Sequence, residues 1–234
     1  YLDDDVWLEP GTVSRLLAAI HELRCGFVGN APHGLSYLDD YRPGQEVGYE
    51  QWRGRPRPER ISPRGPQWIR ARLHSAANLA HLTGKLELPD GEWLAYKVAW
   101  VGACVLFDRL KLLAVGGFDF WSQVPAEHQG EDVVAQLRVL SRYGGAGVLP
   151  SGAYHLESPT TLPDRRVECF DLVPTEAPAR SRASGGLFRR ANARVRGEQL
   201  RDKEPVPVGS VPAEASMSQE KAERPFLDEL IDAM

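Results

Sequence analysis

GEDVVAQLRVLSRYGGAGVL, residues 130–149, is the stretch of sequence that decides the fold. Its apolar residues recur at the spacing of one helical face, as is seen for Val133, Val134, Leu137 and Leu140. We therefore predict a helix over residues 131–143, with Gly144-Gly145 as its end. Val148-Leu149 then predicts a short buried strand, and residues 153–155 predict another.

The first thirty residues show the same alternation of strand and helix. Leu2 is typical of the end of a buried strand, and residues 27–29 predict a short strand of their own. Pro10-Gly11-Thr12 favours a helix start between them, followed by one apolar face made of Val13, Leu16, Leu17 and Ile20. This βαβ order predicts an α/β fold with a mixed, mostly parallel sheet flanked by helices. Because the strand pattern already includes Tyr1-Leu2, we expect the fold to be incomplete at its N-terminus.

The middle of the chain is less regular. Residues 31–66 are rich in proline and arginine and show no apolar period. Such a long basic loop is either a lid or binding loop, or a solvated insertion. We expect a helix over residues 66–81, a strand over residues 93–107, and a short helix over residues 109–115 that ends at Gly116-Gly117.

Composition excludes several classes of protein. With 28 Lys and Arg against 32 Asp and Glu, the formal net charge is −4, so we expect no nucleic-acid partner that depends on bulk positive charge. Three widely spaced cysteines argue against a disulfide scaffold and against a cysteine zinc site. No segment reaches the roughly 18 apolar residues of a membrane span. Together these features favour a cytoplasmic protein.

The C-terminal quarter lacks the residues of a core. Proline, alanine, serine, arginine and glutamate dominate it, and such a segment buries too little apolar surface to offset chain entropy. We therefore predict one domain over residues 1–173 and a low-complexity, mostly disordered tail over residues 174–234. The arginine-rich stretch 180–201 is either a solvated linker or a peripheral contact with anionic lipid.

Three adjacent acids, Asp3-Asp4-Asp5, lie near the start of the chain. Side chains alternate along a strand, so we expect Asp3 and Asp5 to point one way and Asp4 the other. Two converging carboxylates repel each other unless a cation neutralises them, and hard oxygen ligands suit Mg²⁺ or Mn²⁺. A solvated acidic turn is the alternative.

Three further positions carry groups that suit the same site. Glu131 and Asp132 open the predicted helix, whose N-terminus would hold a carboxylate ionised as a base, although helix capping alone explains acids there. His155 ends a predicted strand, and an imidazole that joins the carboxylates would shift metal preference toward Mn²⁺.

Residues 100–107 are first of all typical of a buried strand. Gly102 and Ala103 are small enough for a ligand to approach the backbone closely. Trp100 offers an amphipathic face that suits a sugar ring.

In their order along the chain, these motifs resemble a family 2 glycosyltransferase of the GT-A fold. The resemblance spans roughly residues 1–160 without the variable segment 31–90, and it rests on Asp3-Asp4-Asp5, residues 100–109, 115–119 and 130–138, and His155. In that family the βαβ units that bind the nucleotide precede the aspartates. We therefore expect most of the nucleotide pocket to be missing from this chain.

The resemblance implies an inverting transfer of a sugar from a nucleotide-diphosphate sugar to a hydroxyl of a glycan or glycolipid acceptor, with Mn²⁺ or Mg²⁺ as cofactor. Asp3 and Asp5 match the D-x-D pair of the metal site: Asp5 would ligate the metal on the diphosphate, and Asp3 would contact the nucleotide or the metal's water. His155 matches a histidine that completes the metal site in some members. Asp132 matches the base on the acceptor hydroxyl, and Glu131 would assist in placing the acceptor. Substrate contacts would come from Asp4, Trp100, Gly102 and Ala103.

Two other functions stay open at this point. A sugar-phosphate nucleotidyltransferase of related fold would carry its phosphate-binding loop upstream of Tyr1. A non-catalytic remnant or binding module would instead dock through its tail. Both the glycosyltransferase and the nucleotidyltransferase should bind nucleotides in a metal-dependent way, whereas the binding module should not.

Overall fold

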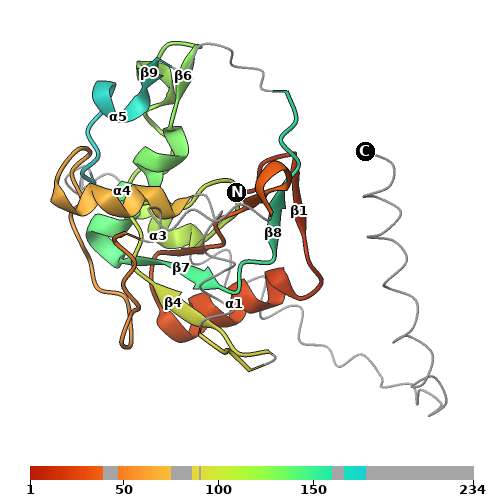
Figure 1. Cartoon of the computed structure of the whole chain (residues 1–234). Coiled ribbons are helices and arrows are strands. Elements are labelled where there is room, and N and C mark those ends of the chain that lie inside the picture. The colour runs from red at the N-terminus through yellow and green to blue at the C-terminus, as the bar shows by residue number, and fades with distance from the viewer. Residues whose placement is uncertain (39–46, 75–85, 90, 160–165, 178–234) are drawn as a thin grey trace, which may run out of the picture. The chain divides into compact units, whose positions relative to one another are not determined.

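The computed structural model describes residues 1–38, 47–74, 86–89, 91–159 and 166–177, which belong to one compact unit spanning residues 1–180. At its centre lies a four-stranded sheet in the order β4–β7–β2–β5 (Figure 1). These strands are β4 (Leu94–Tyr96), β7 (Gly145–Leu149), β2 (Phe27–Gly29) and β5 (Val105–Phe107). β2 and β7 run parallel, and the two outer strands run antiparallel to their neighbours.

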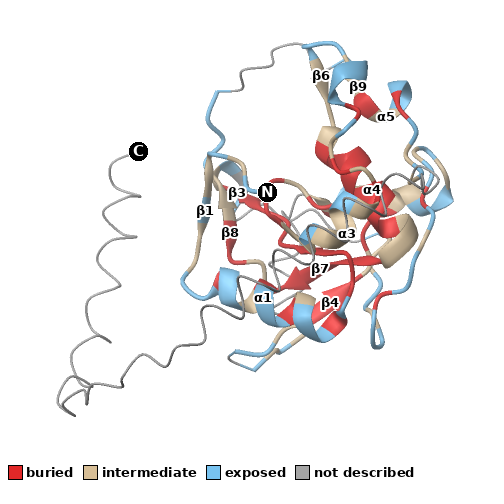
Figure 2. Cartoon of the chain, turned by 180° about the vertical axis from the view of Figure 1, so that it is seen from behind, coloured by how far each residue is buried: buried red, intermediate tan, exposed pale blue. Residues whose placement is uncertain are grey.

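Helices lie on both faces of this sheet. α1 (Thr12–Leu23) packs on one face, and α4 (Glu131–Tyr143) packs on the other. Because side chains alternate along a strand, Val28 belongs to the apolar cluster under α1, whereas Phe27 belongs to the cluster under α4. Figure 2 shows the buried residues gathered in α4 and in the central strands. The domain is therefore an α/β sandwich.

Glycines in β7 make room for aromatic rings on the α4 side. Phe27 lies opposite Gly145, and Tyr96 lies opposite Gly147. A Cβ atom at Gly145 would lie 2.2 Å from the Phe27 ring, and one at Gly147 would lie 2.1 Å from the Tyr96 ring. Any larger residue at these positions would expel a ring from the core, which explains why a central strand carries glycines.

Two smaller sheets and several short helices complete the described part of the chain. The first sheet has the order β1–β8–β3, with β1 (Val6–Leu8), β8 (Ala153–His155) and β3 (His33–Gly34). The second pairs β6 (His128–Gln129) with β9 (Val167–Glu168). The short helices are α3 (Arg109–Ala114), α5 (Cys169–Leu172) and 3₁₀ helices at Leu35–Tyr37, Pro66–His74 and Trp121–Gln123.

The predicted α/β class and the predicted helix 131–143 are confirmed, but a mostly parallel sheet is not. Among the described strands, the parallel pairs are β2–β7, β3–β8 and β6–β9, and the antiparallel pairs are β1–β8, β2–β5 and β4–β7. The strands predicted at residues 27–29 and 153–155 are also present. The central sheet is mixed because its edge strands β4 and β5, which come from the middle of the chain, pair antiparallel with their neighbours.

The apolar face predicted for the first helix is half wrong. Val13 and Leu17 are 53% and 54% exposed, and α1 buries Thr12 and Ala19 in their place. The Thr12 hydroxyl donates a hydrogen bond of 3.1 Å to the carbonyl of Gly152, which turns this side of the helix toward the protein. Apolar spacing therefore predicted the helix but not its rotation.

The strand predicted over residues 93–107 is two strands. β4 and β5 lie at opposite edges of the central sheet, and residues 97–104 connect them outside it. This connection is as apolar as the strands because Val98, Ala99 and Val101 are also buried. A buried apolar run does not reveal its own backbone conformation.

Three other predictions need correction. Residues 31–66 contain β3, and Gln51 in the same segment forms an antiparallel bridge with Tyr96. The helix expected over residues 66–81 is a 3₁₀ helix at Pro66–His74, and residues 75–81 lie outside the described part. Leu2 does form a bridge, with Cys104, but it is 50% exposed rather than buried, because its segment pairs only at the start of β5.

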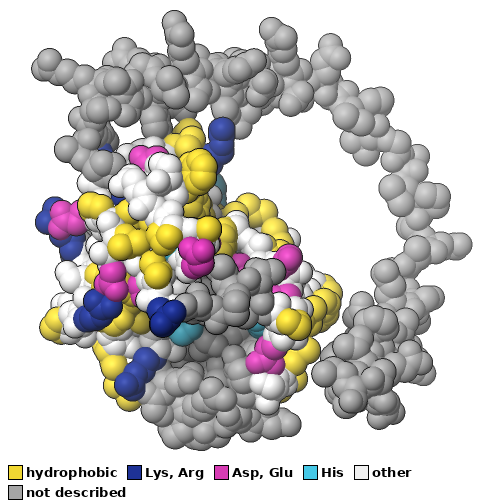
Figure 3. All heavy atoms as spheres, turned by 90° about the horizontal axis from the view of Figure 1, so that it is seen from above, with side chains coloured by type: hydrophobic (Ala, Val, Ile, Leu, Met, Phe, Trp, Pro, Cys, Tyr) yellow, Lys and Arg dark blue, Asp and Glu magenta, His cyan; other side chains and the backbone are white. Residues whose placement is uncertain are grey.

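The tail predicted over residues 174–234 lies outside the described residues from residue 178 onward, and so does the stretch 180–201. Among the described helices, none has the length and apolar character that crossing a bilayer requires. On the face seen in Figure 3, acidic and basic side chains of the described residues lie among one another over the left part, whereas the right part shows acidic but no basic side chains.

Candidate metal centre and adjacent carboxylate

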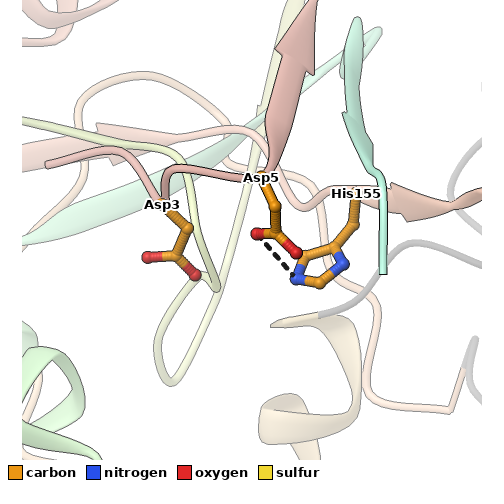
Figure 4. Close-up of side chains that lie close together, drawn as sticks. All are labelled: Asp3, Asp5 and His155. Carbon is orange, nitrogen blue, oxygen red and sulfur yellow. Dashed lines mark ion pairs between the residues drawn. The ribbon is translucent and has the colours of Figure 1, made fainter. Parts of the chain in front are cut away.

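Two carboxylates and an imidazole meet where β1 begins and β8 ends. Asp3 and Asp5 flank a turn that directly precedes β1, and His155 is the last residue of β8. Antiparallel pairing places His155 opposite Val6, next to Asp5 (Figure 4). One ligand atom from each of Asp3, Asp5 and His155 lies within 4.8 Å of the others. We call Asp3, Asp5 and His155 the acidic cluster. Asp4, between the two aspartates, is exposed and does not belong to it.

Backbone groups hold Asp5 and His155 in place. Asp5 Oδ1 lies 3.5 Å from His155 Nε2, and Asp5 Oδ2 accepts a hydrogen bond of 3.1 Å from the amide of Ser158. His155 Nδ1 accepts a hydrogen bond of 3.0 Å from the amide of Glu157. The neutral ring therefore carries its proton on Nε2, toward Asp5. A cation bound at Nε2 would displace this proton to Nδ1 and end the contact with Glu157.

Asp3 connects the acidic cluster to the start of β5. Its amide donates a hydrogen bond of 2.9 Å to the carbonyl of Ala103, so Ala103, predicted to bind substrate, lies beside the cluster. Burial and the charge of Asp5 raise the pKa of the Asp3 carboxyl, whereas a hydrogen bond from the Tyr1 hydroxyl and the charge of His155 oppose this rise. Burial therefore disfavours the ionised form of Asp3, and a positive charge nearby would offset this effect.

Asp132 lies in the first turn of α4 and is buried. Burial, followed by the charges of Glu131 and Asp3, raises the pKa of Asp132 to about 7. The amide groups of the helix N-terminus act in the opposite direction but are outweighed. Our expectation that the helix N-terminus would keep this carboxylate ionised is therefore wrong, because burial dominates. A carboxyl with a pKa near neutrality suits a general base.

Electrostatic interactions join Asp132 to the acidic cluster. The charge of Asp3 is one cause of the raised pKa of Asp132. The charges of Asp132 and Glu131 also raise the pKa of Tyr1, whose hydroxyl bonds to Asp3. Glu131 is more open, with its carboxylate 3.7 Å from Nε2 of His128. These charge interactions link Asp132 and Glu131 to Asp3, whereas the convergence of Asp132 with Asp5 and His155 on one site stays a prediction.

Gln136 is a residue of this site that sequence reasoning missed. It is fully buried, its Oε1 accepts a hydrogen bond of 2.7 Å from the Val101 amide, and its Nε2 donates one of 2.9 Å to the Val101 carbonyl. The same Nε2 lies 3.3 Å from Asp132 Oδ2. Gln136 therefore fastens the connection 97–104 to Asp132. A polar residue on the buried face of α4, four positions after Asp132, is the signal that could have revealed it.

Trp100 and Gly102, which we expected to contact the substrate, both contact His74. The Trp100 ring stacks on the His74 ring at 4.2 Å and 19°, so His74 covers one face of the indole. The Gly102 amide donates to the His74 carbonyl at 3.2 Å, and a Cβ atom at Gly102 would lie 3.1 Å from the same oxygen. The small size of Gly102 thus permits close packing on the 3₁₀ helix Pro66–His74. Burial lowers the pKa of His74, which favours the neutral ring in this stack.

Comparison of the chain with models of protein families, with curated proteins and with solved structures finds no match.

Proposed function

We propose that this protein is a metal-dependent glycosyltransferase of the GT-A type. It would transfer a sugar, with inversion, from a nucleotide-diphosphate sugar to a hydroxyl of a glycan or glycolipid. The observation that carries the proposal is the acidic cluster of Asp3, Asp5 and His155, within 4.8 Å of one another, beside a buried carboxyl whose pKa is near neutral. A solvated acidic turn, which is the alternative for Asp3-Asp4-Asp5, would not require a buried carboxyl such as Asp132.

The donor set fits a divalent cation. Two carboxylates and one imidazole favour Mn²⁺ over Mg²⁺, because nitrogen ligands suit the softer ion. The His155 and Asp5 side chains are partly exposed, so further ligands can come from a substrate. When bound, such an ion supplies positive charge to the departing diphosphate. Asp3, Asp5 and His155 are the residues that would hold it.

Asp132 is the group in this site best suited to accept a proton. At a pKa of about 7, a substantial fraction is ionised at neutral pH, and the ionised form is still basic enough to take a proton from an acceptor hydroxyl. Positive charge near Asp3 would lower the pKa of Asp132 and raise the ionised fraction. Glu131, at the open side of the helix start, is placed to contact the acceptor. We include a cytoplasmic location in the proposal, since all three cysteines are free and buried.

The first test is metal and nucleotide binding by the full chain, measured by isothermal titration with Mn²⁺ in the presence and absence of UDP or GDP. We expect Mn²⁺ to bind, and we expect any binding of nucleoside diphosphate to require it. Asp5→Asn should weaken Mn²⁺ binding by at least about tenfold, because it removes a ligand. Glu22→Gln is the matched control, since it removes the same charge from an exposed position on α1.

The second test separates the reactions. We expect Asp132→Asn to abolish sugar transfer or nucleotide-sugar hydrolysis while Mn²⁺ and nucleotide binding persist. Full activity of Asp132→Asn would contradict the proposed base. A preference for nucleoside triphosphates with release of pyrophosphate would instead identify a nucleotidyltransferase. Absence of metal-dependent nucleotide binding would favour a binding module.

A further inference from the structure

A hollow lies between the end of α1 and the edge strand β4. Its volume is about 400 Å³, within the range of about 300–1,000 Å³ that is usual for ligand sites. Trp52 and Trp93 line it together with the polar residues Glu22, Gln51 and Glu92. None of the residues of the acidic cluster, nor Asp132, lines this hollow. We call it the tryptophan groove.

The backbone places the two indoles on the same face. The Trp52 amide donates a hydrogen bond of 2.9 Å to the Ala95 carbonyl, so Trp52 lies opposite Ala95 in an antiparallel ribbon. Trp93 lies two residues before Ala95, and residues two apart on a strand share a face. Side chains in this diagonal relation are about 7–8 Å apart at the backbone, close enough for two indoles to line one groove. The small, buried Ala95 leaves the hollow open between them.

Charged neighbours hold Trp52 in a fixed orientation. Lys97 Nζ lies 5.2 Å from the centre of the Trp52 ring. Glu50 holds this ammonium group at 2.5 Å and is itself held by Arg70 at 3.0 Å. An aromatic side chain that is oriented before a ligand arrives loses little conformational entropy when it binds.

The charges around the groove disfavour an anionic ligand. Lys97 covers one face of Trp52, but Glu50 neutralises its ammonium group, so the carboxylates of Glu22 and Glu92 set the charge of the lining and would repel an anion. The amide of Gln51 can donate and accept hydrogen bonds, and the two carboxylates accept them. A ligand that fits has flat apolar faces for the indoles and hydroxyl groups for the rim. Sugar rings have both features.

We propose that the tryptophan groove binds an uncharged glycan chain, with sugar rings packed against Trp52 and Trp93. This binding is separate from the acidic cluster and needs neither metal nor nucleotide. It therefore goes beyond the proposed transferase function and can be tested without it.

The test measures binding of four neutral oligosaccharides, namely the hexasaccharides of maltose, cellulose, laminarin and chitin type, to the full chain in the presence of EDTA. Isothermal titration and tryptophan fluorescence report the affinity. We expect saturable binding of at least one oligosaccharide, unchanged between 0.05 and 0.5 M NaCl because no charge is neutralised. Trp52→Ala and Trp93→Ala should each weaken it by about tenfold. Trp121→Ala is the control, since Trp121 is 71% exposed and lies outside the groove.

Trp52 and Trp93 also pack against the core, so a rim substitution is needed that leaves the fold intact. Gln51→Ala removes an exposed amide and should weaken binding severalfold without changing the thermal unfolding midpoint. The proposal is overturned if none of the four oligosaccharides shows saturable binding. It is equally overturned if Trp121→Ala weakens binding as much as the groove variants do, or if choline or a sulfated oligosaccharide binds more tightly than the neutral ones.

Discussion

Asp5 and Asp132 are the same residue type in neighbouring regions of the molecule, but the fold gives them different chemistry. Asp5 lies in a turn at the rim, where a backbone amide and an imidazole contact it. Asp132 lies in the first turn of α4, where burial raises its pKa to about 7. The comparison teaches that depth, rather than residue type, assigns the roles: the rim carboxylate suits a cation, and the buried one suits a proton.

The largest expected effect concerns Asp132, the buried carboxyl, and the dependence of stability on pH. From its ordinary value of 3.8, the pKa of Asp132 rises to about 7 in the folded protein. The folded state then holds a proton between these pH values that the unfolded state has lost, so stability falls as the pH rises from about 4 to about 7. At about 1.4 kcal/mol per pKa unit, Asp132→Asn should stabilise the protein by up to about 4 kcal/mol at pH 8 and change little at pH 4. Urea unfolding in EDTA measures this, and a constant difference between the variants from pH 4 to pH 8 would contradict it.

The second effect concerns Gln136, whose side-chain amide lies next to the buried Asp132. Gln136→Leu leaves the amide and carbonyl of Val101 buried without partners, at about 1–3 kcal/mol each. We expect a loss of about 2–4 kcal/mol in the free energy of unfolding and faster hydrogen exchange at the Val101 amide. Gln123→Leu, at an exposed position, is the matched control. Equal stability of the two variants would show that Gln136 does not hold the connection 97–104.

The third effect tests the exposed partner of the comparison, Asp5, through its neighbour His155 in the acidic cluster. His155→Asn removes the only nitrogen ligand of the acidic cluster, so Mn²⁺ affinity should fall by about tenfold and Mg²⁺ affinity by less. Titration calorimetry with each ion measures the ratio. His21→Asn, which alters an exposed histidine on α1, should leave both affinities unchanged. A uniform loss for both ions would mean that the imidazole positions Asp5 rather than selecting the metal.

The smallest effect tests whether the two regions form one site. Asp3 is one cause of the raised pKa of Asp132, although burial and Glu131 contribute more. In metal-free protein, Asp3→Asn should therefore lower the pKa of Asp132 slightly, whereas Glu22→Gln should not. Carbon-13 NMR titration of the aspartate carboxyls can resolve such a change. An unchanged pKa of Asp132 would separate the acidic cluster from the buried carboxyl and weaken the proposed transferase.

The parts of the fold that were predictable are those whose pattern repeats locally. The helix over residues 131–143 was predicted with its bounds, because its apolar residues recur over more than three turns and glycine ends it. The connection 97–104 was not, because its buried apolar residues resemble a strand while their hydrogen bonds go to Gln136 and His74. In the site, Asp3, Asp5 and His155 could be singled out as candidates. Gln136 carries a local signal, its polar side chain on the buried face of α4, but its partner Val101 lies far away in the chain. The stacked ring of His74 carries no such signal, because its role depends on the distant Trp100.

The sequence by itself determined the α/β class, the long helix and the residue types that a metal site requires, because periodicity, glycine signals and acidic clusters are local properties. Only the tertiary structure decided which face of α1 is buried and which face of Trp100 is covered. It also decided that burial raises the pKa of Asp132 to about 7, so that this carboxyl is not a permanently ionised cap. A carboxyl's pKa depends on how much water and how many charges surround it, and both are set by segments brought together through folding.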